Sequence, residues 1–147
     1  MASRPEIEAA LWFHDAIYDV RRSDNESRSA LWAQQELLVA GESIAHRVHE
    51  LIMVTGHFAL PASPEEKLVV DIDLAILGAD TARYREYEDQ IRQEYAWVSE
   101  EQFRRARCDI LAGLLARPCI FSTPPFHDDL ERSARANLEQ SLADLSR

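Results

Sequence analysis

The sequence predicts an all-α protein, a compact bundle of about seven helices that forms one domain over residues 1–147. Every long apolar-periodic segment repeats at about 3.6 residues, and no alternating apolar and polar run indicates a strand or a hairpin. The chain has 147 residues, of which 46% are hydrophobic, so one domain can bury a core. Regularly spaced helix-start signals are the third observation, and they place the individual helices.

Four helices are expected in the first half of the chain, over 5–18, 25–40, 43–54 and 64–77. Three of them follow a serine with glutamate three residues later, the capping box that satisfies free N–H groups at a helix start: Ser3, Ser23 and Ser63. Gly41 and Gly78 follow the second and fourth helices, where the left-handed conformation that ends a helix favours glycine. The fourth helix is apolar nearly all round, which is typical of a central helix.

Three helices are expected in the second half, over 81–96, 100–116 and 127–145. The middle one follows a capping box of Ser99 and Gln102. Its apolar residues share one face: Phe103, Ala106, Ile110, Leu111, Leu114 and Leu115. The proline-bearing loops HFALPAS and RPCIFSTPPF are irregular, and loops of this kind often flank a functional site.

The charge and hydropathy of the chain restrict its partners. Sixteen basic and 26 acidic side chains give a formal net charge of −10, which repels a nucleic-acid backbone. No apolar run approaches the roughly 20 residues of a membrane span, and the first residues lack the apolar centre of a signal peptide. We therefore expect a cytoplasmic protein without a nucleic-acid or membrane partner, whereas a small phosphorylated substrate is compatible with this charge.

A histidine and an aspartate lie side by side in the apolar stretch ALWFHDAIYD. His14 falls on the apolar face of the first predicted helix, together with Ile7, Ala10, Leu11, Ile17 and Tyr18. A histidine on such a face is commonly a hydrogen-bonded core residue. The adjacent Asp15 changes this interpretation, because a buried unpaired carboxylate is costly and normally finds a cation or a metal ion.

The predicted helix 64–77 repeats this pattern. Asp73 shares a face with Val69, Ile72, Ile76 and Leu77, and Asp71 is the second choice. Imidazole and carboxylate groups together suit a divalent ion such as Mn, Fe, Co, Ni, Zn or Mg, without selecting one of them. The helix phase predicts that the Asp73 carboxylate lies within about 3–5 Å of the His14 ring.

Several blocks of the sequence carry a family resemblance, in the order WFHDAIYD, DNESRSA, LIMVTGH, DIDLAILGAD, YREYEDQIRQEYAWV and IFSTPPFHDDLERSARANLEQ. Together they resemble a bacterial family of metal-dependent phosphohydrolases in the HD-domain superfamily, from Leu11 to about Leu142. The resemblance implies an all-helical fold in which a histidine, a later His-Asp pair and a distal aspartate hold a divalent ion. Matched to this chain, the pair is His14 and Asp15, and the distal aspartate is Asp73.

The resemblance also implies the reaction, hydrolysis of a small phosphate ester or nucleotide. A divalent ion polarises a phosphoryl oxygen and acidifies a bound water, and Asp15 would orient or deprotonate that water. Asn25 and Glu26 match a family block at a helix start, where Glu26 is either a second catalytic group or part of a helix cap. His57 matches a recurrent family histidine that would bind phosphate, bind a second ion or serve the structure.

Three arginines lie in family-like blocks and could neutralise a substrate phosphate: Arg92, Arg107 and Arg135. Helical arginines beside glutamates are more commonly partners in ion pairs, which is the alternative for all three. The remaining histidines have simpler interpretations, with His46 and His49 as solvated helix residues and His127 near a helix start.

The chain departs from the family pattern at its beginning. The family's first metal histidine comes from a preceding helix, in a HYHN-like block, whereas none of the 13 residues before His14 is a histidine. We therefore expect a shortened domain with weak metal binding and low phosphohydrolase activity. The alternative is a non-catalytic helical module for binding or dimerisation, and apolar surface left by a missing helix would favour a homodimer.

Overall fold

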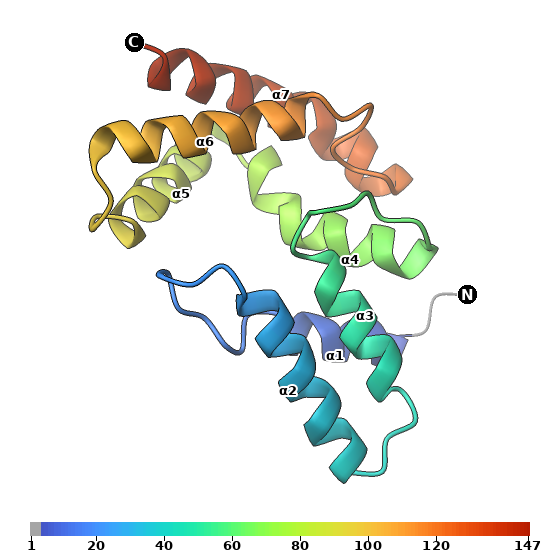
Figure 1. The fold of residues 1–147 in the computed structure, drawn as a ribbon. Coiled ribbons are helices and arrows are strands. Elements are labelled where there is room, and N and C mark those ends of the chain that lie inside the picture. Colours follow the sequence, from blue (N-terminus) through green and yellow to red (C-terminus); the bar gives the residue numbers. More distant parts are fainter. Residues whose placement is uncertain (1–3) are drawn as a thin grey trace. The chain divides into compact units, whose positions relative to one another are not determined.

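The computed structural model describes residues 4–147, and this part of the chain is all-helical, with no strand (Figure 1). Its elements are α1 (Arg4–Phe13), α2 (Asn25–Val39), α3 (Ala45–Val54), α4 (Pro64–Leu74), the short 3₁₀-helix η1 (Ala75–Gly78), α5 (Thr81–Glu94), α6 (Glu100–Leu115) and α7 (Pro124–Leu145). The predicted fold class is thus confirmed. None of the helices within residues 4–147 has the length and apolar character needed to cross a membrane.

The contacts within the chain define two compact units, the first ending at Asp73 and the second running from Leu74 to Arg147. The single domain expected from the sequence stays a prediction. In the first unit α1, α2 and α3 pack on one another, and α4 joins their core through Val69. The buried cluster consists of Ile7, Ala10, Ala30, Ala33, Val48, Leu51, Ile52 and Val69. Small alanines on α1 and α2 allow these helices to approach α3 closely, and each buried leucine or isoleucine stabilises the fold by about 1.5–3 kcal/mol.

Helix α1 ends at Phe13, earlier than the predicted end at residue 18. His14 Nδ1 lies 2.8 Å from the carbonyl oxygen of Leu11, one of the carbonyls that a helix end leaves free. The backbone of Ile17 then turns to Ser29 on α2, whose Oγ accepts from the Ile17 N–H at 3.0 Å and donates to its carbonyl at 3.1 Å. These side-chain contacts satisfy the backbone outside a helix, so the apolar rhythm through Tyr18 does not extend α1.

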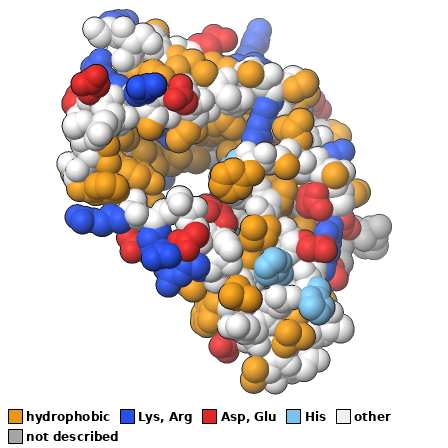
Figure 2. All heavy atoms as spheres, in the orientation of Figure 1, with side chains coloured by type: hydrophobic (Ala, Val, Ile, Leu, Met, Phe, Trp, Pro, Cys, Tyr) orange, Lys and Arg blue, Asp and Glu red, His pale blue; other side chains and the backbone are white. Residues whose placement is uncertain are grey.

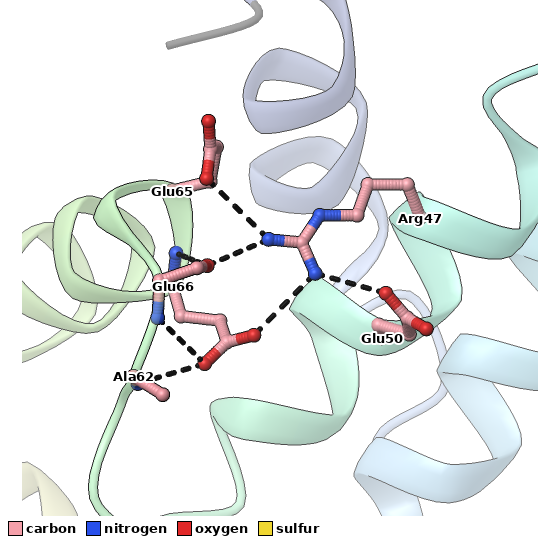
Figure 3. A network of polar contacts seen from close by, with 6 residues as sticks. Arg47, Glu50, Ala62, Glu65 and Glu66 are labelled. Carbon is pink, nitrogen blue, oxygen red and sulfur yellow. Dashed lines mark hydrogen bonds and ion pairs between the residues drawn. The ribbon is translucent and has the colours of Figure 1, made fainter.

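Arg47 on α3 fixes the start of α4 (Figure 3). Its guanidinium contacts the side chains of Glu50, Ser63, Glu65 and Glu66. The Ser63 capping box is formed as predicted, because Ser63 Oγ accepts from the Glu66 N–H at 3.2 Å and Glu66 accepts from the Ser63 N–H at 3.3 Å. Helix α3 and the first turn of α4 are therefore held together across the loop that contains His57.

The other predicted helix starts were confirmed in some cases and wrong in others. Ser99 caps α6 by accepting from the Gln102 N–H at 3.3 Å. Ser23 does not cap α2, because the chain enters this helix one residue later, at Asp24. Ser3 lies outside the described residues. Helix α7 starts at Pro124 rather than at residue 127, since proline has the fixed backbone angle of a first helical turn.

The two glycines expected to be left-handed differ. Gly41 has φ +77° and ends α2 as predicted. Gly78 is not left-handed, so that prediction was wrong, and its role lies in packing: a Cβ at this position would lie 2.6 Å from the Cβ of Leu130 on α7.

In the second unit α7 packs against α6 and η1 (Figure 1). The Asn137 side chain donates to the carbonyls of Leu77 and Ala79, both at 2.9 Å, and thereby fixes η1 against α7. Glu131 accepts from the backbone N–H groups of Ile120 and Phe121, which holds the segment before α7. Hydrophobic side chains also reach the surface among the charged ones, as the face in Figure 2 shows.

Candidate functional site

Four side chains meet in the first unit, and each comes from the end of a helix. His14 and Asp15 directly follow α1, His57 follows α3, and Asp73 lies in the last turn of α4. His14 Nε2 lies 3.2 Å from Asp15 Oδ2 and 3.3 Å from Asp73 Oδ1. His57 Nε2 lies 2.8 Å from the other Asp73 oxygen, Oδ2. Asp73 therefore contacts both histidines, and its distance to His14 agrees with the value expected from the helix phase.

The hydrogen bonds of His14 determine which of its nitrogens faces the carboxylates. The Leu11 carbonyl can only accept, so Nδ1, 2.8 Å away, carries a hydrogen and donates it. Nε2 is left facing two carboxylate oxygens. A neutral imidazole with this tautomer would point its lone pair at two negative charges, so this nitrogen needs a proton or a metal ion.

The electrostatics of the metal-free cluster follow from these contacts. Hydrogen bonds to Asp15 and then Asp73 raise the pKa of His14 to about 10, against the opposing effect of burial. Burial alone would raise the pKa of Asp73, but hydrogen bonds from His14 and His57 outweigh it and lower that pKa to about 2. The cluster at neutral pH is thus an imidazolium ion between two carboxylates, and Asp15, which is 70% exposed, connects it to solvent.

His57 has a left-handed backbone, with φ 59°, and is the one non-glycine residue with positive φ in the part of the chain described. Such a conformation costs of order 1 kcal/mol for a residue with a Cβ and is found preferentially at functional sites. Here it follows the end of α3, with its N–H bonded to the Val54 carbonyl at 3.2 Å and its imidazole in contact with Asp73. Periodicity could not have found this contact, and the block TGHF was the only signal for this histidine.

The structure corrects the predicted faces of α4. Ile72, expected on the buried face with Asp73, is exposed, whereas Asp71 is completely buried. Asp73 lies at the edge of the buried surface and is half-buried. Asp73 was therefore correctly placed beside His14, although the apolar face used to place it was wrong.

Asn25 and Glu26 lie in the first turn of α2. The Asn25 side chain accepts from the Asp19 N–H at 3.1 Å and donates to the Asp19 carbonyl at 2.9 Å, so it fixes the loop that follows Asp15. Glu26 is not part of a capping box with Ser23, since Asp24 precedes the helix. As an acidic residue of the first turn, Glu26 complements the positive end of the helix dipole.

The three arginines considered for phosphate binding all lie in the second unit and serve its structure. Arg92 binds Glu100 and donates to the carbonyls of Tyr95 and Val98. Arg107 is buried in an ion pair with Glu88 and lies on the inner face of α6, whereas Ala106 and Ile110, which were expected on that face, are exposed. Arg135 binds Glu131 and the carbonyls of Leu115, Arg117 and Pro118.

The remaining histidines lie outside the cluster. His46 is exposed and lies 2.6 Å from the Gln34 amide, and His49 is half-buried on the same helix. His127 is exposed near the start of α7 and lies beside Asp128. The positions of His46 and His127 agree with the sequence-based interpretation, whereas His49, expected to be solvated, is half-buried.

The donor types in the cluster suit a divalent ion, but the present arrangement of the side chains does not form a metal site. Within residues 4–147, no group of three or more His, Cys, Asp or Glu side chains is arranged to hold a metal ion. The donor atoms of His14, Asp15 and Asp73 contact one another instead. Their types suit a divalent ion, and separations of 3.2 and 3.3 Å are close to those of neighbouring ligand atoms, each about 2.1 Å from one ion.

A scan against protein-family models, a search of curated proteins and a search of solved structures each found no match to this chain.

Proposed function

We propose that this chain is a divalent metal-dependent phosphohydrolase of the HD type, acting on a small phosphate ester or nucleotide in the cytoplasm. One observation carries the proposal: His14 directs Nε2 at the carboxylates of Asp15 and Asp73 while Nδ1 is held by the Leu11 carbonyl. Histidines that bind metals characteristically donate their second ring N–H to a carbonyl or carboxylate in this way. The blocks around His14, Asp15 and Asp73 are also those that resemble the HD-domain superfamily.

Each side chain of the cluster has a role in this proposal. His14, Asp15 and Asp73 would hold the ion, which when bound supplies the polarisation of a phosphoryl oxygen and of a water molecule. Asp15 is the most exposed of the three, so its carboxylate is accessible to orient a water and accept its proton. His57 holds Asp73 by the 2.8 Å contact and leaves the second carboxylate oxygen for the ion.

The proposal predicts a specific signature of metal binding. Because the pKa of His14 is raised to about 10, its Nε2 carries a proton at neutral pH that the ion must displace. The ionised Asp73 has none to release. Calorimetric titration with Mn²⁺ or Ni²⁺ in two buffers of different ionisation heat should therefore show release of about one proton per bound ion. With three protein ligands we expect weak binding, and hydrolysis of p-nitrophenyl phosphate or nucleotides that rises with added Mn²⁺.

Variants separate this site from adventitious binding. His14→Ala and Asp73→Asn should abolish both the binding heat and the metal-dependent hydrolysis, whereas His46→Ala removes an exposed histidine of the same unit and should change neither. Binding that persists in His14→Ala would refute the assignment of the site. Tight binding of one ion per chain would show that a further residue completes the ligand set.

A specific observation also favours the alternative, a non-catalytic helical module. His14 and His57 already contact the carboxylates of the cluster through their Nε2 atoms, so the cluster can stabilise the fold as an ion-pair network without an ion. Absence of metal binding and of turnover, together with a large loss of stability in His14→Ala, would favour this second function.

A further inference from the structure

Helix α2 has apolar residues on two opposite faces. Its inner face buries Ala30 and Ala33 in the core of the first unit. Its outer face carries four large apolar side chains that are between 41% and 87% exposed, namely Leu31, Trp32, Leu38 and Val39. A helix that is apolar on both faces normally buries both, and a contiguous apolar patch on the surface marks an interaction site.

The spacing of these residues suits a helix partner. Leu31 and Leu38 are seven residues apart, as are Trp32 and Val39, so the four side chains form one stripe along two turns of α2. The stripe is also held in place, because the Trp32 ring packs edge-on against Phe13 at a centroid distance of 5.3 Å. A fixed aromatic ring loses little entropy on association, which suits a docking residue.

We propose that the outer face of α2 is a self-association surface, on which α2 of a second copy lies antiparallel about a twofold axis at Gln35. This inference goes beyond the proposed function and does not depend on it. About that axis Leu31 faces Val39 of the second copy, and Trp32 faces Leu38. Each apolar side chain thus meets an apolar partner, and every contact occurs twice, as in any isologous interface.

The charged residues at the two ends of the stripe favour a second copy of the chain as the partner, in the antiparallel orientation. Arg28 and Glu42 are both exposed and lie seven residues to either side of Gln35. Glu42 lies just past the end of α2, after the left-handed Gly41, and its N–H is bonded back to the Leu37 carbonyl at 2.8 Å, which keeps it at the end of the stripe. An antiparallel pair brings Arg28 of each copy to Glu42 of the other, whereas a parallel pair would place like charges together. The surface is therefore complementary to itself.

The surface is small. One helix face buries less than the roughly 800 Å² per partner of a standard stable interface, so we expect a reversible dimer that depends on concentration. Sedimentation velocity of the whole chain over a wide concentration range should show this monomer–dimer equilibrium. Val39→Lys should raise the dimer dissociation constant by at least about tenfold, because it places two buried charges in the stripe.

Charge exchange provides the decisive measurement. Arg28→Glu should weaken the dimer, and Arg28→Glu combined with Glu42→Arg should restore it to within about threefold of the wild type. Ile110→Lys, which changes an exposed isoleucine of the second unit, is the matched control and should leave the dissociation constant unchanged. Circular dichroism checks that each variant keeps its helix content. A wild-type chain that stays monomeric, or an exchanged pair that fails to restore a folded dimer, would overturn the proposal.

Discussion

Replacement of His14 by Gln tests the electrostatics of the cluster directly, through the pH dependence of stability. The substitution keeps a side chain of similar size but removes the proton that Nε2 holds between Asp15 and Asp73. Because the pKa of His14 is raised from 6.5 to about 10 in the folded protein, its contribution to stability is fully present below pH 6.5. It is lost as the pH rises through 10, where the folded protein also releases the proton.

The size of this contribution follows from the two contacts. A difference of one in pKa corresponds to about 1.4 kcal/mol, so the full shift would amount to about 5 kcal/mol. The hydrogen bond that raises the pKa of His14 most is the one to Asp15, and water screens this contact because the Asp15 side chain is 70% exposed. We therefore expect about 2 kcal/mol at pH 6, decreasing toward zero above pH 10.

The assay is urea unfolding at intervals from pH 6 to pH 10.5, with a chelator present so that no metal competes for Nε2. The free energy of unfolding of the wild type, minus that of His14→Gln, should fall across this range. His46→Gln is the matched control, since His46 contacts the neutral Gln34 amide, and it should show no such trend. A difference between wild type and His14→Gln that is independent of pH would refute the reasoning.

Three further predictions concern Asp73 and the second unit. Since the pKa of Asp73 is lowered to about 2, the ionised carboxylate contributes about 2 kcal/mol to the free energy of unfolding above pH 3.8, and this contribution is lost as the pH falls through 2. Asp73→Asn should remove this pH dependence from acid unfolding curves. Gly78→Ala should lower the free energy of unfolding by about 1–3 kcal/mol in thermal unfolding, because the new methyl group would lie 2.6 Å from a side-chain carbon of α7. Gly113→Ala is the contrasting variant: nothing lies within 4 Å of its new methyl group, so it should stabilise α6 by up to about 1 kcal/mol. Arg107→Met should cost about 3 kcal/mol in urea unfolding by leaving the Glu88 carboxylate unpaired, and the added change Glu88→Gln should recover most of the loss.

The helices were predictable from the sequence because their signals are local. Apolar residues three and four apart on α3, such as Val48, Leu51 and Ile52, predict both the helix and its buried face. The capping box at Ser63 marks the start of α4 for the same reason, since it joins atoms only three residues apart. The end of α1 was missed because it depends on Ser29, 12 residues from the backbone of Ile17 that it binds.

The cluster was only partly predictable, for a related reason. Its residues lie at helix ends, where apolar periodicity no longer constrains the position of a side chain. Asp73 was found because a carboxylate among aliphatic residues is conspicuous, yet the fully buried carboxylate of that helix is Asp71. The contact between His57 and Asp73 depends on a left-handed backbone at His57, a conformation that only a few per cent of non-glycine residues adopt, so it has no clear signal in the sequence.

The loops that carry the cluster are each held by contacts independent of it. Asn25 and Ser29 fix the segment after α1, and Arg47 with Glu66 fixes the start of α4. These contacts hold the backbone of Ile17 and Asp19, just after the His14–Asp15 pair, and the first turn of the helix that carries Asp73. The proton on His14 Nε2 offsets the repulsion between the carboxylates of Asp15 and Asp73 in the metal-free protein. In the proposed function, a divalent ion would compete with this proton for the position between the two carboxylates.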